Sequence, residues 1–242
     1  MPQRAYYRYP LPGMENLHCT GKLIVLEGPD GVGRSTQIAL LTEWLEAQGY
    51  AVYSSGLKRS ELAAQGIATA KQGHTLGHLT MALFYTADFA DRLERNIIPA
   101  LQAGFVVLTD RYIYSVMARA MVRGVDVEWL RDIMGIALVP DAIFYLRTDI
   151  DHLLPRVLGT RGFDFWESGM DFMGSSDYYE SYVAYQQHML EAFDALGHEY
   201  GFRNIDATRG VHEVFTDLCQ SIIELVRPLK LDLALNPSPP QS

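Results

Sequence analysis

The sequence GPDGVGRST, residues Gly28–Thr36, has the form of a phosphate-binding loop. It follows the pattern G-x-x-x-x-G-K-[ST], except that Arg34 stands where the pattern has lysine. An apolar run, Leu23–Glu27 (LIVLE), directly precedes the loop, and apolar residues at helical spacing follow it. This is the strand–loop–helix context that the motif requires. We therefore predict a site for nucleotide phosphates; the alternative is a glycine-rich turn that binds nothing.

The residue types in this loop suit phosphate binding. Its glycines let the backbone wrap N–H groups around phosphate oxygens, and the N-terminus of the following helix adds partial positive charge. Ser35 is expected to bind Mg²⁺ through its hydroxyl. Arg34 keeps the charge of lysine on a wider, planar head, so we expect binding to persist and the rate to depend on the fit. The expected cofactor-binding residues are Gly28, Asp30, Gly31, Val32, Gly33, Arg34, Ser35 and Thr36.

Short apolar runs alternate with longer helical stretches along the chain, which indicates parallel βαβ units. Strands are expected at Leu23–Glu27, Tyr50–Ser54, Phe105–Thr109, Ala142–Leu146 and Phe202–Asp206. Helices are expected at Arg34–Gln48, Leu79–Ala103, Ile113–Arg123, Glu128–Leu138, Ile150–Leu158, Tyr178–Leu196 and Val211–Val226. We predict one α/β domain of the P-loop NTPase class, a five-stranded parallel sheet flanked by helices on both faces.

Composition narrows the possible partners. Of 242 residues, 48% are hydrophobic and 20% charged, as in ordinary globular proteins. The formal charge of −9 argues against a general nucleic-acid binder, which needs a basic face. No apolar run approaches the roughly 20 residues of a membrane span, so no membrane association is expected. Two distant cysteines, Cys19 and Cys219, suit a reducing cytoplasm.

Further segments point to a family. They are LIVLEGPDGVGRSTQ (23–37), LFYTADFADRLERNIIPALQAGFVVLTDRYIYS (83–115), PDAIFYLRTD (140–149) and NIDATRGVHEVF (204–215). Together they resemble thymidylate kinases, and more broadly the P-loop nucleoside monophosphate kinases, from about Gly21 to about Leu225. The resemblance implies transfer of the γ-phosphoryl group of ATP–Mg²⁺ to a nucleoside monophosphate, with dTMP as the first choice. It also implies a homodimer formed through helices on one side of the sheet.

Asp110 and Arg111 follow an apolar strand, at the sheet edge where ligands of open α/β sheets lie. The resemblance implies that Asp110 organises Mg²⁺ and that Arg111 bridges the donor and acceptor phosphates. Phosphoryl transfer depends mainly on positioning and charge neutralisation, for which such a pair is suited. The alternative is a strand-end ion pair. The expected metal ligands are Ser35 and Asp110; the expected catalytic residues are Arg34, Asp110, Arg111 and Arg161.

The resemblance divides the chain into parts. An N-terminal extension (1–20), partly ordered by its aromatic residues, precedes a kinase domain (21–230) and a loose C-terminal tail (231–242). A mobile lid is expected at about 156–176, where Arg156 and Arg161 match lid arginines. Of the two, Arg161 is preferred as the donor-phosphate ligand, and the alternative is an exposed charged loop.

The acceptor half departs from the family. Asp88 stands where an arginine grips the acceptor phosphate, and the tyrosine and glutamine of S-x-x-A-Y-Q-G are missing after Ser115. Asp88 would either repel the acceptor or pair with Arg92, one helical turn later. Arg119, Arg92 and Lys58 are candidates to compensate. The expected substrate-binding residues are Asp30, Phe84, Asp88, Arg111, Ser115, Arg119 and Tyr185.

Two other functions therefore stay open beside dTMP phosphorylation. One is a kinase for a different nucleotide acceptor, and the other is a catalytically weak nucleotide-binding regulatory module. Asp110 and Arg111 favour an enzyme, whereas Arg34 and Asp88 favour the module. His74 and His78 lack the glutamate of a zinc-binding H-E-x-x-H helix and are interpreted as solvated loop residues.

Overall fold

The computed structural model describes residues 3–57, 60, 63–73, 77–160 and 162–235. Within these residues, five strands form one parallel sheet in the order β2-β3-β1-β4-β5, which confirms the predicted fold class. The strands are β1 (Lys22–Glu27), β2 (Val52–Gly56), β3 (Val106–Asp110), β4 (Ala142–Arg147) and β5 (Arg203–Asp206). Leu26 lies opposite Asp110, so β1 and β3 end side by side at the carboxyl edge of the sheet.

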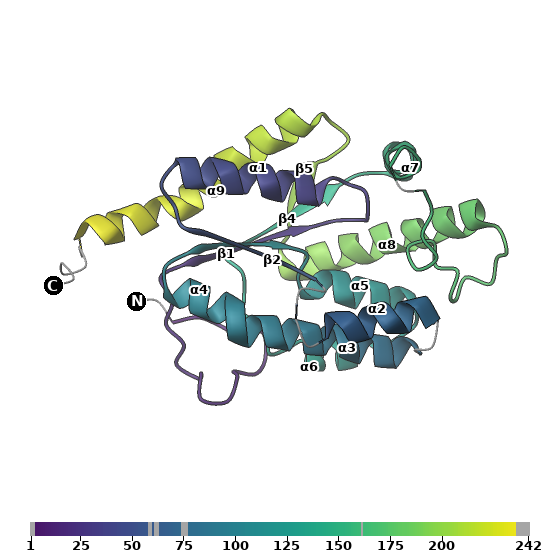
Figure 1. The fold of residues 1–242 in the computed structure, drawn as a ribbon, viewed down its shortest axis with the longest axis horizontal. Helices are drawn as coiled ribbons and strands as arrows, with labels where there is room; N and C mark the ends of the chain where they lie inside the picture. Colours follow the sequence, from purple (N-terminus) through teal and green to yellow (C-terminus); the bar gives the residue numbers. More distant parts are fainter. Residues whose placement is uncertain (1–2, 58–59, 61–62, 74–76, 161, 236–242) are drawn as a thin grey trace.

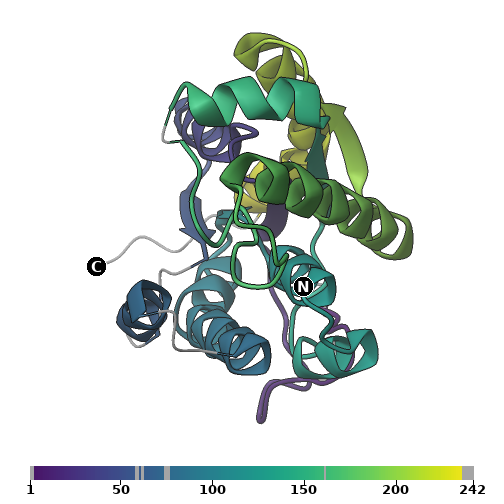
Figure 2. The same ribbon diagram turned by 90° about the vertical axis from the view of Figure 1, so that its right-hand side faces the viewer.

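Helices cover both faces of the sheet, as Figures 1 and 2 show. On one face, Ile24 and Leu26 belong to a hydrophobic core with residues of α1, α7 and α9; on the other, Leu23 and Val25 belong to a core with residues of α3, η1, α4, α5, α6 and α8. Both faces of β1 are therefore buried. The helical elements are α1 (Arg34–Ala47), α2 (Ala64–Gly73), α3 (His78–Arg92), η1 (Leu93–Ile97), α4 (Ile98–Gln102), α5 (Ile113–Val122), α6 (Val127–Ile133), α7 (Ile150–Leu158), α8 (Tyr178–Tyr200) and α9 (Val211–Leu235).

Four sequence-based boundaries need correction, among them the end of α8, which lies at Tyr200 and not at Leu196. Strand β2 begins two residues later than expected, because the Tyr50 N–H donates to Leu45 O and completes the end of α1. Helix α6 ends at Ile133, because the chain after it pairs with the N-terminal segment. Helix α9 continues to Leu235, so the predicted tail at 231–242 starts too early; residues 236–242 lie outside the described part.

Helix α2 is an addition to the predicted elements. Its sequence, AQGIATAKQG, carries two glycines, which lower the helix propensity. Gly66 has a packing reason, because a Cβ there would lie 2.9 Å from the Phe84 ring on α3. The close packing of α2 on α3 thus requires a glycine, although glycine lowers the predicted helix propensity of α2.

The predicted helix at Leu79–Ala103 is one continuous helical segment with a π-helical turn, η1, between α3 and α4. Two hydrophobic residues of this turn, Leu93 and Ile97, are fully buried. Such turns are rare and often lie near functional sites. The turn changes the angular relation between α3, which reaches the carboxyl edge of the sheet, and α4.

The N-terminal segment 3–20 packs against the domain, and its path is drawn in purple in Figure 1. Arg4 pairs with Asp141 at 2.6 Å, and the Tyr7 N–H donates to Ala137 O at 3.0 Å. The Tyr7 ring lies edge-on to Tyr114 and Tyr200, with centroids 6.4 and 5.1 Å away. Burial raises the pKa of Tyr7 to about 12. The expectation that aromatic residues order this extension is confirmed.

We expect Tyr7→Ala to lower the free energy of unfolding by about 2 to 3 kcal/mol, because it removes a ring packed between two others. Chemical denaturation followed by circular dichroism measures this change. Tyr9→Ala is the matched control, since Tyr9 lies on the same segment and is 51% exposed. Equal losses for both variants would mean that Tyr7 does not anchor the segment.

None of the helices in the described ranges is long and apolar enough to span a bilayer.

Candidate active site

The loop Gly28–Thr36 joins β1 to α1, as predicted. Gly28 and Gly31 have φ angles of 146° and 89°, which favour glycine. A Cβ at Gly28 would lie 2.9 Å from Leu146 O, and one at Gly31 would lie 2.6 Å from Val157 Cγ2. The loop is thus folded tightly against β4 and α7. Helix α1 starts at Arg34, so its N-terminus faces the loop, while Val32 packs into the core and Thr36 is exposed.

Arg34 lies inside the loop and is 6% exposed. Its Nη1 donates to Gly28 O and, at 2.5 Å, to Pro29 O; its Nε donates to Asp110 Oδ1 at 2.8 Å. Ser35 Oγ donates to Asp110 Oδ2 at 2.7 Å. The structure therefore brings Arg34, Ser35 and Asp110 together, as the sequence predicts.

A magnesium ion fits this pair of oxygen ligands. Mg²⁺ in nucleotide sites commonly takes one or two protein oxygens and completes its shell with phosphates and water. Ser35 and Asp110 supply a hydroxyl and a carboxylate in contact. In the described part of the chain, no group of three His, Cys, Asp or Glu side chains is arranged to hold a metal without phosphates. Because Ser35 and Asp110 lie beside the phosphate loop, their oxygens suit a metal that arrives with a nucleotide.

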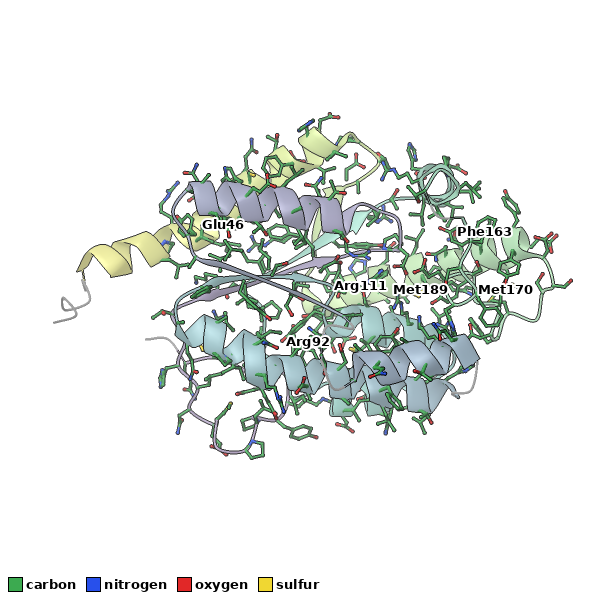
Figure 3. The ribbon with its side chains drawn as sticks, in the orientation of Figure 1. Glu46, Arg92, Arg111, Phe163, Met170 and Met189 are labelled. Carbon is green, nitrogen blue, oxygen red and sulfur yellow. The ribbon has the colours of Figure 1, made fainter. Side chains whose placement is uncertain are left out.

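Arg111 adopts an unusual backbone conformation. Its φ is +71°, and it alone among the described non-glycine residues has a positive φ. The Arg111 N–H donates to Leu26 O at 3.0 Å, and Thr109 Oγ1 donates to Arg111 O at 2.6 Å. Such strain costs of order 1–3 kcal/mol and persists where the surroundings enforce it. Figure 3 shows the side chain that this turn directs into the space between the sheet and α5.

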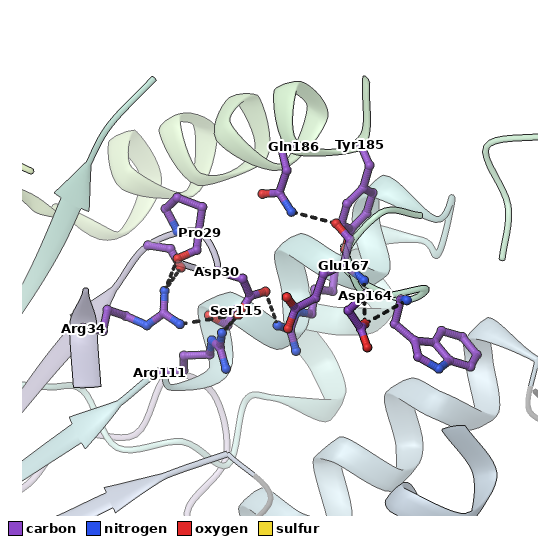
Figure 4. A network of polar contacts seen from close by, with 12 residues as sticks. Pro29, Asp30, Arg34, Arg111, Ser115, Asp164, Glu167, Tyr185 and Gln186 are labelled. Carbon is purple, nitrogen blue, oxygen red and sulfur yellow. Dashed lines mark hydrogen bonds and ion pairs between the residues drawn. The ribbon is translucent and has the colours of Figure 1, made fainter. Parts of the chain in front are cut away.

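Asp30 connects three guanidinium groups. It forms a close ion pair with Arg111, accepts a hydrogen bond from Arg119 Nη2 at 2.6 Å, and lies 3.7 Å from Arg34 Nη2. Figure 4 shows the Asp30 carboxylate between Arg34 and Arg111. These arginines come from α1, the β3–α5 turn and α5. The cluster gathers cations where the phosphate loop meets α5, an arrangement that favours phosphate groups.

Glu27 at the end of β1 was not among the predicted site residues, but it binds the start of α5 next to Arg111. It is fully buried and accepts hydrogen bonds from Tyr112 N at 2.8 Å and Ser115 Oγ at 2.5 Å. Burial raises its pKa, while the bonds from Ser115 and Tyr112 and the nearby Arg34 and Arg111 act in the opposite direction. Its position could have indicated this role, because Glu27 is a charged residue at the end of the apolar run Leu23–Leu26.

A pocket lies beside the cluster, between α3, α5, α8 and the segment after α7. Arg119 connects the two, because it lines the pocket and bonds to Asp30. The Tyr85 hydroxyl, which belongs to another lining residue, is buried and has no hydrogen-bond partner among the described residues. The pocket is lined by Lys71, His78, Met81, Ala82, Tyr85, Val116, Arg119, Ala120, Arg123, Trp166, Glu167 and Tyr185.

The sequence profile of the thymidylate kinases matches residues 26–218. The chain belongs to the thymidylate kinase family. It is 35% identical over 208 residues to a probable thymidylate kinase 2 of Saccharolobus solfataricus, covering 85% of this chain and 97% of that protein. It is 38% identical over 146 residues to a probable thymidylate kinase of Thermococcus kodakarensis, with coverages of 55% and 70%. A thymidylate kinase of Clavibacter sepedonicus is 41% identical over 145 residues, with coverages of 57% and 67%.

Within this thymidylate kinase fold, the predicted substrate-binding residues lie in different places, with Asp30 and Arg111 in the cluster beside the pocket. Arg119 and Tyr185 line the pocket. Phe84 lies outside the lining, because its side of α3 faces Gly66 on α2. Ser115 is also outside the lining, and its hydroxyl is bonded to Glu27. Tyr85 takes the pocket-facing position expected of Phe84.

Asp88 also lies outside the pocket lining. Its side chain is fully buried, accepts from Ser60 N at 3.0 Å, and pairs with Arg92 Nε at 3.0 Å. Arg92 is 1% exposed and also donates to Ser55 Oγ at 3.2 Å. Of the two alternatives for Asp88, the structure shows the ion pair with Arg92. The Asp88 carboxylate is thus fully buried between Ser60 and Arg92.

The segment expected to form a lid, at about 156–176, is described except for residue 161. Arg156 belongs to α7, and its Nη2 donates to Thr208 O at 3.4 Å. Arg161 and Lys58 lie outside the described residues, so their expected roles stay predictions. His78 is not a loop residue as expected: it begins α3 and lies 3.4 Å from Asp171.

Proposed function

We propose that this chain transfers the γ-phosphoryl group of ATP to thymidylate, yielding ADP and dTDP. The observation that carries the proposal is the Asp30 cluster, which joins the phosphate loop to a pocket lined by aromatic residues. Membership of the thymidylate kinase family supports it. In the reaction, an oxygen of the acceptor phosphate forms a bond to the γ-phosphorus, and the bond from that phosphorus to the ADP oxygen breaks.

The phosphate loop, two arginines of the cluster and the Ser35–Asp110 pair have separate roles in this proposal. The N–H groups of the loop and of the α1 N-terminus bind the phosphates of ATP. Arg34 and Arg111 neutralise oxygens of the transferred group, whose charge is spread in the transition state. Ser35 and Asp110 hold Mg²⁺, which screens the charge of the phosphates when bound.

The pocket fixes the direction of the acceptor. Its phosphate lies toward Arg111 and Arg119, next to the loop, and its base lies toward Trp166 and Tyr185. Flat, apolar side chains suit a base, and the few polar groups among them set its orientation. This assignment replaces Asp88 by Arg119 as the charged residue nearest the acceptor.

A turnover assay separates dTMP phosphorylation from the two alternatives. Purified protein is mixed with ATP–Mg²⁺ and each common nucleoside monophosphate in turn, and ADP formation is followed. Fastest turnover with dTMP is expected. A different preferred monophosphate would support the second candidate, a kinase for another nucleotide acceptor. ATP binding without any turnover would support a regulatory module.

We further propose that the chain works as a homodimer in the cytoplasm, with ATP and Mg²⁺ as its cofactors. The family and the cysteine content support these proposals. Light scattering coupled to size-exclusion chromatography tests the dimer, for which a mass near twice that of one chain is expected.

We propose that the Tyr85 hydroxyl forms a hydrogen bond with the bound acceptor. Tyr85→Phe removes this bond and is expected to raise the KM for the acceptor about tenfold, which corresponds to roughly 1.4 kcal/mol. The KM for ATP should not change, and thermal stability should not fall, since a buried hydroxyl without a partner is unfavourable. Steady-state kinetics and thermal unfolding measure these effects.

Tyr145→Phe is the control for Tyr85→Phe. The Tyr145 hydroxyl is also buried without a hydrogen-bond partner in the described ranges, but it lines a separate hollow near Arg147 and Asn204. An equal rise in acceptor KM for both variants would count against a direct role of Tyr85.

A further inference from the structure

A buried ion pair lies at the far end of the acceptor pocket from the phosphate loop. Arg123, just after α5, binds Asp171 with both oxygens engaged, through Nε at 2.8 Å and Nη2 at 2.9 Å. Arg123 is 9% exposed and Asp171 is 8% exposed. Separating them would leave an unpaired buried charge, which is costly, so the two side chains stay together.

Arg123 is fixed by further contacts. Its guanidinium carbon lies 5.2 Å from the centre of the Phe172 ring and 5.0 Å from that of Tyr185. Its Nη1 donates to the Tyr185 hydroxyl at 2.9 Å, and its Nη2 to Trp166 O at 3.0 Å. Arg123 therefore joins α5, α8 and the segment 164–173.

The segment 164–173 forms one wall of the pocket through Trp166 and Glu167. The Trp166 indole N–H donates to Lys71 O on α2 at 3.2 Å, and Gln186 Nε2 donates to Glu167 O at 2.8 Å, a bond drawn in Figure 4. The ion pair is the charged attachment of this segment to α5, the helix that also carries Arg119.

We infer that Asp171 and Arg123 are positioning residues for the acceptor: their ion pair sets the distance between Trp166 and Glu167 on one wall and Arg119 on the other. Neither residue needs to contact the reacting atoms. This inference rests on the proposed function, because it assigns the pocket to a nucleoside monophosphate. It predicts that the pair controls acceptor affinity and leaves the donor site unchanged.

The test uses the full-length chain with Asp171→Asn and Arg123→Lys. Asparagine keeps the shape of Asp171 without its charge, and lysine keeps the charge of Arg123 without the two-pronged contact. For each variant we expect the acceptor KM to rise about tenfold or more, as for loss of a charge-assisted contact. The KM for ATP is expected to stay within about twofold.

The control is Asp194→Asn. Asp194 also binds an arginine with both oxygens, Arg147 Nε at 3.1 Å and Nη2 at 2.9 Å, but this pair is exposed and lies away from the acceptor pocket. No change in the acceptor KM is expected for it. An effect equal to that of Asp171→Asn would overturn the inference.

A second measurement needs no ligand. The amides of Ser168, Met170 and Met173 donate to carbonyls within segment 164–173 and exchange hydrogen when the segment opens. In Asp171→Asn we expect their exchange to accelerate at least tenfold, with exchange in α9 unchanged. Unchanged exchange and unchanged acceptor KM in folded variants would overturn the inference. Accelerated exchange without turnover by the wild-type chain would instead contradict the proposed function alone.

Discussion

Asp110→Asn is expected to lower kcat about a hundredfold or more with little loss of stability, because it weakens charge organisation in the transition state. Asp110 accepts hydrogen bonds from both Arg34 and Ser35, so its carboxylate fixes the cation and the hydroxyl of the phosphate loop at once. Asparagine offers one acceptor oxygen and no charge. Steady-state kinetics at saturating ATP, Mg²⁺ and dTMP measure the effect.

Asp132→Asn is the control for Asp110→Asn. Asp132 also accepts a hydrogen bond from an arginine, Arg8, but it is about half exposed on α6. Its kcat is expected to equal that of the wild-type chain. If Asp110→Asn also kept full kcat with unchanged circular dichroism, Asp110 would be a strand-end ion pair and no more.

Arg34→Ala is expected to lower kcat/KM about a thousandfold, by loss of a cation on the transferred group, whereas Arg34→Lys should change it less than about tenfold. The alanine variant removes the cation that bonds to Asp110 and to the carbonyls of Gly28 and Pro29. Lysine restores the charge on a smaller head. Kinetics together with calorimetric titration of ATP separate binding from turnover.

The pair of Arg34 variants decides what the arginine contributes. Equal losses for lysine and alanine would mean that the forked guanidinium, bonded in three directions, is required. No loss for alanine would remove Arg34 from the proposed chemistry. Arg131→Ala is the control, since Arg131 pairs with Glu199 between α6 and α8, away from the loop.

The strands of the sheet were predictable because each is marked by the residue types within its own short segment. LIVLE, FVVLT and AIFYL are apolar nearly throughout, which is what burial on both faces requires. Helix α2 was not predictable in this way. Gly66 lowers its propensity, and the reason for that glycine is a ring eighteen positions further along the chain. The early end of α6 likewise depends on pairing with residues near the N-terminus.

The candidate site divides in the same manner. Gly28–Thr36 follows β1 directly and Asp110 is the last residue of β3, so strand order brings them to one edge of the sheet. The pocket proposed for the acceptor is built by side chains from α2, α3, α5, α8 and the segment after α7, and no spacing rule connects them. Asp88 illustrates this limit. Its position in the sequence suggests a contact with the acceptor, whereas Arg92, four residues later, could be named only as one possible partner; the structure shows that the two form an ion pair.

The π-helical turn η1 has a consequence for how this chain is compared with its relatives. A π-helical turn takes up one more residue than an α-helical turn, and each residue advances an α-helix by about 100°, so a regular α-helix with the same number of residues would rotate α3 by roughly that angle relative to α4. Tyr85 would leave the pocket and the Asp88–Arg92 pair would leave the core. When this chain is aligned with a relative that has a regular helix here, an alignment anchored at Phe84 and one anchored at Pro99 therefore differ by one residue. A chimaera that borrows α3 from a relative with a regular helix must therefore replace His78–Gln102 as a whole.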